Sequence, residues 1–147
     1  MSRQYRTSRL RMFGTDRSAT AAVEFAILSP LYIFLIMGMT AYGIYFGASH
    51  SVQQLSADAA RAAIAGIDAT ERQTLASDFI GRNASGYLFI DGDKLSVSVG
   101  DNPAVPGQFN VTISYDASNL PIWGLFDRLA MPHRTILRRS TIRIGGI

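Results

Sequence analysis

Residues 25–46 read FAILSPLYIFLIMGMTAYGIYF, the longest and densest apolar stretch of the chain. Its 22 residues include no Asp, Glu, Lys or Arg, and the charge-free segment continues to Ala57. A helix needs about 20 apolar residues to cross a bilayer, so we expect a transmembrane helix at residues 20–48. The alternatives are a buried helix of a soluble protein and a secretory signal cleaved near Gly47-Ala48-Ser49. A signal normally has a shorter apolar region of about 7–15 residues.

The charges around this stretch predict its orientation. The chain has 147 residues, a net charge of +3 and a pI near 9.6. Residues 1–19 carry a net charge of +4 from five arginines and one aspartate, and the remaining 128 residues carry −1. Basic residues stay on the cytoplasmic side of a membrane, so we expect a cytoplasmic N-terminus and a periplasmic domain at residues 49–147. Because the basic excess lies in the tail, it does not indicate a nucleic-acid partner.

Glu24 is a charged residue at the start of the apolar block, between Val23 and Phe25. An ionised carboxylate is poorly solvated in hydrocarbon, so we treat an acidic residue in a membrane segment as a candidate functional residue. The alternative is an interfacial glutamate that reaches back to headgroup water or to Arg17.

The segment from Ala19 to Pro30, ATAAVEFAILSP, resembles the N-terminus of TadE-like pseudopilins, minor pilin-like proteins of tight adherence (Tad or Flp pilus) systems. The shared features are the Ala-Ala-Val-Glu-Phe core with Glu24 and Phe25, the apolar run, and Pro30 six residues after the glutamate. Residues 55–63 (LSADAARAA) also resemble the family. The resemblance implies a pilin-like α+β fold, with a long N-terminal transmembrane helix packed on a small antiparallel β-sheet.

The resemblance also implies cleavage by a prepilin peptidase, which leaves the glutamate fifth in the mature chain. On this sequence the cut falls between Ala19 and Thr20 and removes a basic leader, residues 1–19. The family usually has glycine before the cut, where this chain has Ala19. Cleavage would create a positive α-amine at Thr20. Glu24 of a neighbouring subunit would pair with that amine, since an unpaired charge in a low-dielectric interior is strongly penalised.

Two further features of the apolar stretch concern helix packing. Pro30 removes one backbone hydrogen bond and predicts a bend or local unwinding, either as a tolerated kink or as a device that lets the helix extend in a filament. Gly43 and Gly47 form a Gly-x-x-x-Gly pair, which lets helix backbones approach closely in lipid. We therefore expect assembly residues at Glu24, Phe25, Pro30, Gly43 and Gly47.

The chain beyond residue 48 predicts a helix laid on an antiparallel meander, which satisfies the need for two packed layers. The first helix is expected to continue to Gly66, because apolar residues recur at helical spacing from Val52 to Ala63. Asp68 and Glu71 form a capping box for a second helix that ends near Asn83. Alternating or apolar runs predict strands at residues 87–91, 95–99, 109–115 and 136–144, with a hairpin tip at 101–107 and a loop or short helix at 119–132.

The sequence predicts no catalytic, metal or cofactor site. It has no cysteine, which excludes a thiolate metal site, and His50 and His133 are far apart in the chain. A basic cluster near the C-terminus is either the solvated face of an edge strand, which resists unwanted pairing, or a docking patch for acidic partner subunits. Its members are Arg134, Arg138, Arg139 and Arg143.

The function that the resemblance implies is pilus assembly from the bacterial inner membrane, within the fibre or as its primer. The expected partners are a prepilin peptidase, other pilin and pseudopilin subunits, the inner-membrane assembly platform and membrane lipid. Such a protein is the substrate of an enzyme and is not itself an enzyme. The alternatives are an uncleaved, membrane-anchored periplasmic scaffold or binding subunit of an envelope complex, and a small periplasmic enzyme released by signal cleavage.

Overall fold

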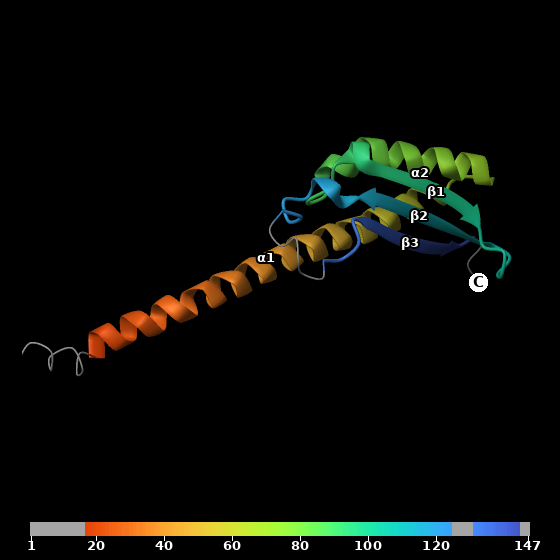
Figure 1. The fold of residues 1–147 in the computed structure, drawn as a ribbon. Helices are drawn as coiled ribbons and strands as arrows, with labels where there is room; N and C mark the ends of the chain where they lie inside the picture. The colour runs from red at the N-terminus through yellow and green to blue at the C-terminus, as the bar shows by residue number, and fades with distance from the viewer. Residues whose placement is uncertain (1–16, 125–130, 145–147) are drawn as a thin grey trace, which may run out of the picture. The chain divides into compact units, whose positions relative to one another are not determined.

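The computed structural model describes residues 17–124 and 131–144, with side chains from Thr20 onward. The chain divides into two compact units, Met1–Thr40 and Ala41–Ile147. Within the described residues the elements are α1 (Arg17–Ala63), α2 (Ala69–Asn83), β1 (Leu95–Asp101), β2 (Gln108–Asp116) and β3 (Thr135–Arg143), as Figure 1 shows. A long apolar helix with a small antiparallel sheet is an α+β fold, as expected. Residues 1–16 of the predicted leader and residues 125–130 of the predicted loop or short helix lie outside the described residues.

The first unit consists, in its described part, of the apolar half of α1. Every side chain from Thr20 to Thr40 is exposed or half-buried, and Phe25 is 73% exposed. The helix is long and apolar enough to cross a membrane, with a mean hydropathy of 1.9 in a window of which 0% is buried. A soluble core helix would bury such a window, so the exposure indicates membrane anchoring. The helix continues through Pro30, and the expected local unwinding is not observed, because one lost hydrogen bond leaves the flanking turns intact.

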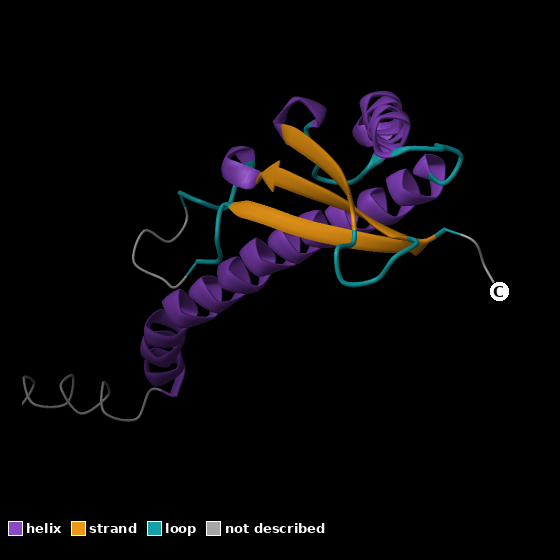
Figure 2. Ribbon diagram, turned by 90° about the vertical axis from the view of Figure 1, so that its right-hand side faces the viewer, coloured by secondary structure: helices purple, strands orange, loops and turns teal. Residues whose placement is uncertain are grey.

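The second unit packs the rest of α1 against one face of the sheet, which has the order β1-β2-β3 (Figure 2). Burial alternates along β2 and shows which face of the sheet points into the core. The buried side chains on this face are Phe109, Val111, Ile113 and Tyr115, whereas the residues between them are half-buried. α1 contributes a stripe of buried small and aliphatic side chains to the same core, namely Ala41, Ala48, Val52, Leu55, Ala59, Ala60 and Ala63. The stripe expected from Val52 to Ala63 is confirmed, whereas α1 ends at Ala63 and not at the expected Gly66.

α2 covers the outer edge of β1. It begins as the capping residues predict, because the amide of Glu71 donates to Asp68 Oδ1 at 2.8 Å. The side-chain amide of Gln73 then pairs with the strand, donating from Nε2 to Val97 O at 3.2 Å and accepting from Val99 N at 2.6 Å. A single side chain thereby replaces a neighbouring strand and protects the sheet edge.

The prediction of a strand at residues 87–91 is wrong. Tyr87 to Asp91 form turns between two 3₁₀ segments, and Phe89 adopts a left-handed φ of 63°. The carbonyl of Phe89 accepts a hydrogen bond from the Tyr115 hydroxyl at 3.0 Å. The carbonyl oxygen of Phe89 therefore bonds to the Tyr115 side chain and not to the backbone of a neighbouring strand. The other three strands and the hairpin tip are confirmed, with β1 and β2 paired from Leu95↔Tyr115 to Asp101↔Phe109.

Candidate functional site

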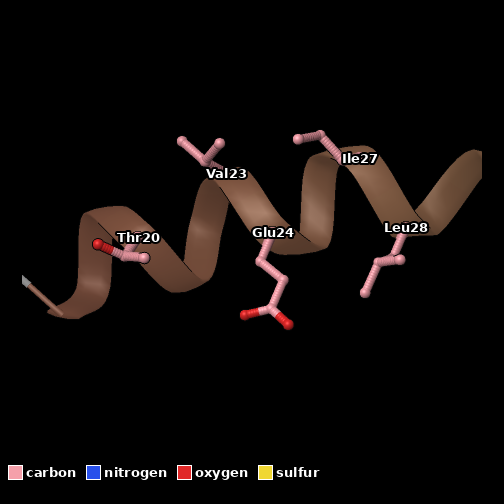
Figure 3. Close-up of a pocket in the computed structure, with 5 residues that line it drawn as sticks. All are labelled: Thr20, Val23, Glu24, Ile27 and Leu28. Carbon is pink, nitrogen blue, oxygen red and sulfur yellow. The ribbon is translucent and has the colours of Figure 1, made fainter.

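The N-terminal face of α1 carries the expected assembly glutamate. Thr20, Glu24 and Leu28 follow one another at intervals of one helical turn and, with Val23 and Ile27, line a hollow on the helix (Figure 3). Figure 3 shows the Glu24 carboxylate on the same side as Leu28, with Val23 and Ile27 pointing the other way. Glu24 has no ion pair with any residue that the structure describes. The helix therefore presents an exposed carboxylate among exposed apolar side chains.

The other residues predicted for processing and packing lie along the same helix. Ala19 and Thr20, which flank the predicted cut, are in the first turn of α1. Phe25 and Pro30 are exposed. A Cβ added at Gly43 would meet nothing within 4 Å, so this glycine leaves open space beside the helix.

Gly47 differs from Gly43 because its open side is filled. A Cβ at Gly47 would lie 3.0 Å from Cε2 and 3.1 Å from Cδ2 of Phe89. The ring of Phe89 therefore packs directly on the helix backbone at the position where glycine leaves room. The structure gives Gly47 a contact within its own domain, and a contact with a neighbouring subunit stays a prediction.

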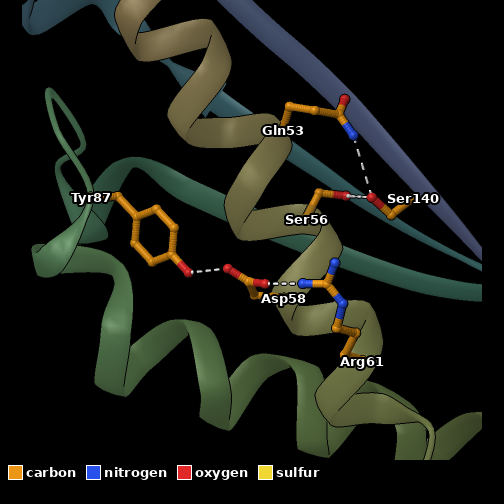
Figure 4. Close-up of polar contacts among 6 residues, drawn as sticks. All are labelled: Gln53, Ser56, Asp58, Arg61, Tyr87 and Ser140. Carbon is orange, nitrogen blue, oxygen red and sulfur yellow. Dashed lines mark hydrogen bonds and ion pairs between the residues drawn. The ribbon is translucent and has the colours of Figure 1, made fainter.

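Polar contacts tie the second half of α1 to the sheet (Figure 4). The hydroxyl of Ser56, which is fully buried, lies 3.1 Å from the carbonyl oxygen of Val111 and 3.0 Å from Ser140 Oγ. Gln53 Nε2 donates to the same Ser140 oxygen at 3.4 Å. Buried hydroxyls are costly unless they are bonded, so these contacts specify where along β2 and β3 the helix packs.

A second polar group joins α1 to the turn after α2. The hydroxyl of Tyr87 donates to Asp58 Oδ2 at 2.8 Å, and the other oxygen of that carboxylate pairs with Arg61 (Figure 4). Burial and the hydrogen bond to Asp58 raise the pKa of Tyr87 to about 12. Both effects disfavour a phenolate beside a carboxylate. The pair locks the Tyr87–Asp91 turn onto the helix.

The predicted basic cluster does not occupy one face. The backbone groups of the even-numbered residues at both ends of β3 point toward β2. The carbonyl oxygen of Arg134 accepts a hydrogen bond from the amide of Ala117, and the amide of Ile144 donates one to the carbonyl oxygen of Gly107. Since hydrogen-bonded residues alternate along an antiparallel strand, the odd-numbered residues of β3 direct their backbone groups to its open edge. Arg139 lies on the outer face, where Nε contacts Thr112 at 3.3 Å. Arg138 lies on the helix-facing side and donates to Ser49 Oγ and, at 2.8 Å, to Leu137 O.

Sequence reasoning missed three residues that shape this part of the molecule. Arg72 of α2 is 5% exposed, pairs with Asp101 at 2.9 Å and lies 5.1 Å from the centre of the Phe109 ring. Phe89 and Arg138 were also not foreseen in their contacts with α1. Of these contacts, only the one between Phe89 and α1 had a signal in the sequence, because Gly47 allows close approach to the helix backbone. Within the described residues, no group of three or more His, Cys, Asp or Glu side chains could hold a metal ion.

The fold and the exposed helix define a class: an α+β protein with one N-terminal apolar helix suited to membrane anchoring. Residues 19–61 match the family of TadE-like proteins, which confirms the resemblance read from the Ala19–Pro30 segment. The match lies within α1 and includes its apolar half, and it supports a TadE-like protein of Tad pilus systems. No curated protein and no solved structure matches the chain.

Proposed function

We propose that this chain is a pseudopilin-like subunit that takes part in the assembly of a Tad pilus. The observation that supports this most strongly is the exposed apolar helix carrying Glu24 at its N-terminal end, inside the segment that matches TadE-like proteins. The role is structural. Residues 20–48 would anchor the protein in the inner membrane, with the leader in the cytoplasm and residues 49–147 forming the periplasmic domain.

Processing at Ala19–Thr20 by a prepilin peptidase would give Glu24 its partner. The new α-amine at Thr20 would be one turn, about 6 Å, from the level of Glu24 on the same helix. Two parallel copies shifted by that amount would bring the carboxylate of one level with the amine of the other. Loss of either partner of such a pair in low dielectric costs about 3–5 kcal/mol, so the pair would fix one register between subunits.

The remaining assembly residues would act by shape. Phe25 is exposed beside the glutamate, and Pro30 would accommodate adjustment of the helix once subunits pack. Gly43 offers an open face for a neighbouring helix. Other pilin and pseudopilin subunits and the assembly platform in the inner membrane would be the partners on these surfaces.

Substitution of Glu24 tests this proposal in cells that carry the whole pilus system. Glu24→Gln keeps the shape of the side chain and removes its charge, and Thr40→Val is an isosteric control on the same helix. We expect Glu24→Gln to remain in the membrane after alkaline carbonate extraction. Its cross-links to other subunits should fall at least about tenfold, as loss of the pair implies. Wild-type cross-linking by Glu24→Gln would contradict the proposed role of the carboxylate.

A further inference from the structure

A cavity of about 180 Å³ lies at the junction of α1 and β3, in the second unit of the chain. Its lining residues are Phe46, Ser49, His50, Gln53 and Arg138. Four of these side chains carry hydrogen-bonding groups and one is apolar, and within the described part of the chain no carboxylate lines the cavity. Such a set of donors beside a guanidinium fits an anion.

The guanidinium of Arg138 is the centre of this site. It is half-buried, and it donates one hydrogen bond to Ser49 Oγ and one to the carbonyl oxygen of Leu137. Arginine has five N–H donors, so most of its donor capacity remains for a ligand. Among the described residues no carboxylate pairs with Arg138. An anion in the cavity would neutralise its charge with charge-assisted hydrogen bonds.

The position of the cavity along the helix identifies the source of that anion. Phe46 is the last residue of the dense apolar run, and Tyr42 and Tyr45 precede it, as in the aromatic belt at a membrane interface. At about 1.5 Å per residue, His50 lies about 6 Å beyond Phe46 along α1. The polar headgroup layer of a leaflet is about 5–8 Å thick. Ser49 and His50, together with Arg138 through its hydrogen bond to Ser49, would therefore lie at the depth of the lipid phosphates.

We propose that the Arg138 cavity binds the phosphate of an anionic phospholipid in the leaflet next to the folded domain. The planar guanidinium would hold two phosphate oxygens, and His50 and Gln53 would complete the contact while Phe46 lies among the acyl chains. Because Ser49 and Arg138 come from α1 and β3, the bound headgroup would also fix the domain on the membrane surface. This proposal rests on the membrane anchoring in the proposed function.

The test uses the full chain purified in micelles that contain equal amounts of phosphatidylglycerol and phosphatidylethanolamine, with bound lipid counted by native mass spectrometry. We expect the wild type to retain phosphatidylglycerol about tenfold over phosphatidylethanolamine, because both lipids present a phosphate but only phosphatidylethanolamine carries an ammonium group that competes with Arg138 for it. Arg138→Gln should abolish the preference. Arg139→Gln, which removes the adjacent arginine on the opposite face of β3, should keep it. Equal ratios in these two variants would overturn the proposal.

A second variant is used if circular dichroism shows that Arg138→Gln does not fold. Arg138→Lys keeps the charge and loses the planar fork, so we expect the lipid ratio to fall to about a third, and a wild-type ratio would overturn the proposal. Displacement of phosphatidylglycerol by equimolar inorganic phosphate would show a site for soluble anions and reject the lipid. A bound protein chain lost on Arg138→Gln would assign the site to a partner's carboxylate instead.

The two levels of the proposal fail in different ways. Release of the wild type from membranes by alkaline carbonate would contradict the anchoring itself. Retention in the membrane without a preference for phosphatidylglycerol would contradict the lipid site alone.

Discussion

Replacing Gly47 with alanine tests whether this glycine serves the folded domain through Phe89. The new Cβ would lie 3.0 Å from Phe89 Cε2, so the ring must move by a few tenths of an ångström. Phe89 is restrained, because its backbone has a φ of 63° and its carbonyl accepts from Tyr115. Overpacking costs about 1–3 kcal/mol, and alanine gains about 1 kcal/mol over glycine in a helix. We expect a net destabilisation of up to about 2 kcal/mol.

Gly43→Ala is the matched control, because a Cβ there meets nothing within 4 Å. It should be neutral or stabilising by up to about 1 kcal/mol. In a Phe89→Ala background the clash is absent, so Gly47→Ala should also become neutral or stabilising. The double-mutant cycle should therefore give a coupling energy between positions 47 and 89 of about 1–3 kcal/mol.

Thermal unfolding of the full chain in detergent micelles, followed by the fluorescence of Trp123, measures these differences. A change of 1 kcal/mol should shift Tm by about 4 °C for a domain of roughly 100 residues. Equal destabilisation by Gly47→Ala with and without Phe89 would show that the Phe89 ring is not what the new Cβ meets. It would assign the glycine to another contact, such as one between subunits.

Three further predictions concern the packing of the domain. Leu55→Ala empties a fully buried position and should lower the free energy of unfolding in denaturant titrations by about 2–5 kcal/mol; a change below 1 kcal/mol would place Leu55 outside the core. Gln73→Ala removes the acceptor 2.6 Å from Val99 N, so hydrogen exchange at Val99 should accelerate about tenfold, whereas an unchanged rate would show that α2 does not protect β1. The Tyr87 pKa of about 12 exceeds the ordinary value of about 10, so its contribution to stability is present below pH 10 and lost as the pH rises toward 12. Tyrosinate absorbance, assigned with Tyr87→Phe, should show this pKa returning toward 10 in Asp58→Asn, and an unmoved titration would contradict the role of the hydrogen bond.

The elements that follow from local hydrophobic patterns could be predicted from the sequence. The apolar run to Phe46 predicted the exposed helix, and the alternation from Phe109 to Tyr115 predicted the buried face of β2. Both patterns are local: the length of the apolar run specifies the helix, and burial of alternate residues on one face specifies the strand. The Asp68 cap was readable for the same reason, because capping acts over three residues.

The features that escaped prediction depend on single side chains that meet across long sequence separations. Residues 87–91 have the composition of a strand, yet the hydrogen bond from Tyr115 to Phe89 O makes them a turn. Gln73 covers the edge of β1 from another element. The pairing of Arg138 with Ser49 unites residues 89 positions apart. Such contacts leave no periodic signal in the sequence, so only the structure brings them together.

The intact mass of the protein extracted from membranes shows whether residues 1–19 are removed. Expression of the 147-residue chain with and without a prepilin peptidase separates a processed pseudopilin from an uncleaved membrane scaffold. We predict loss of residues 1–19 and a mature N-terminus at Thr20, only where the peptidase is present. A chain that retains its leader in both strains would contradict it.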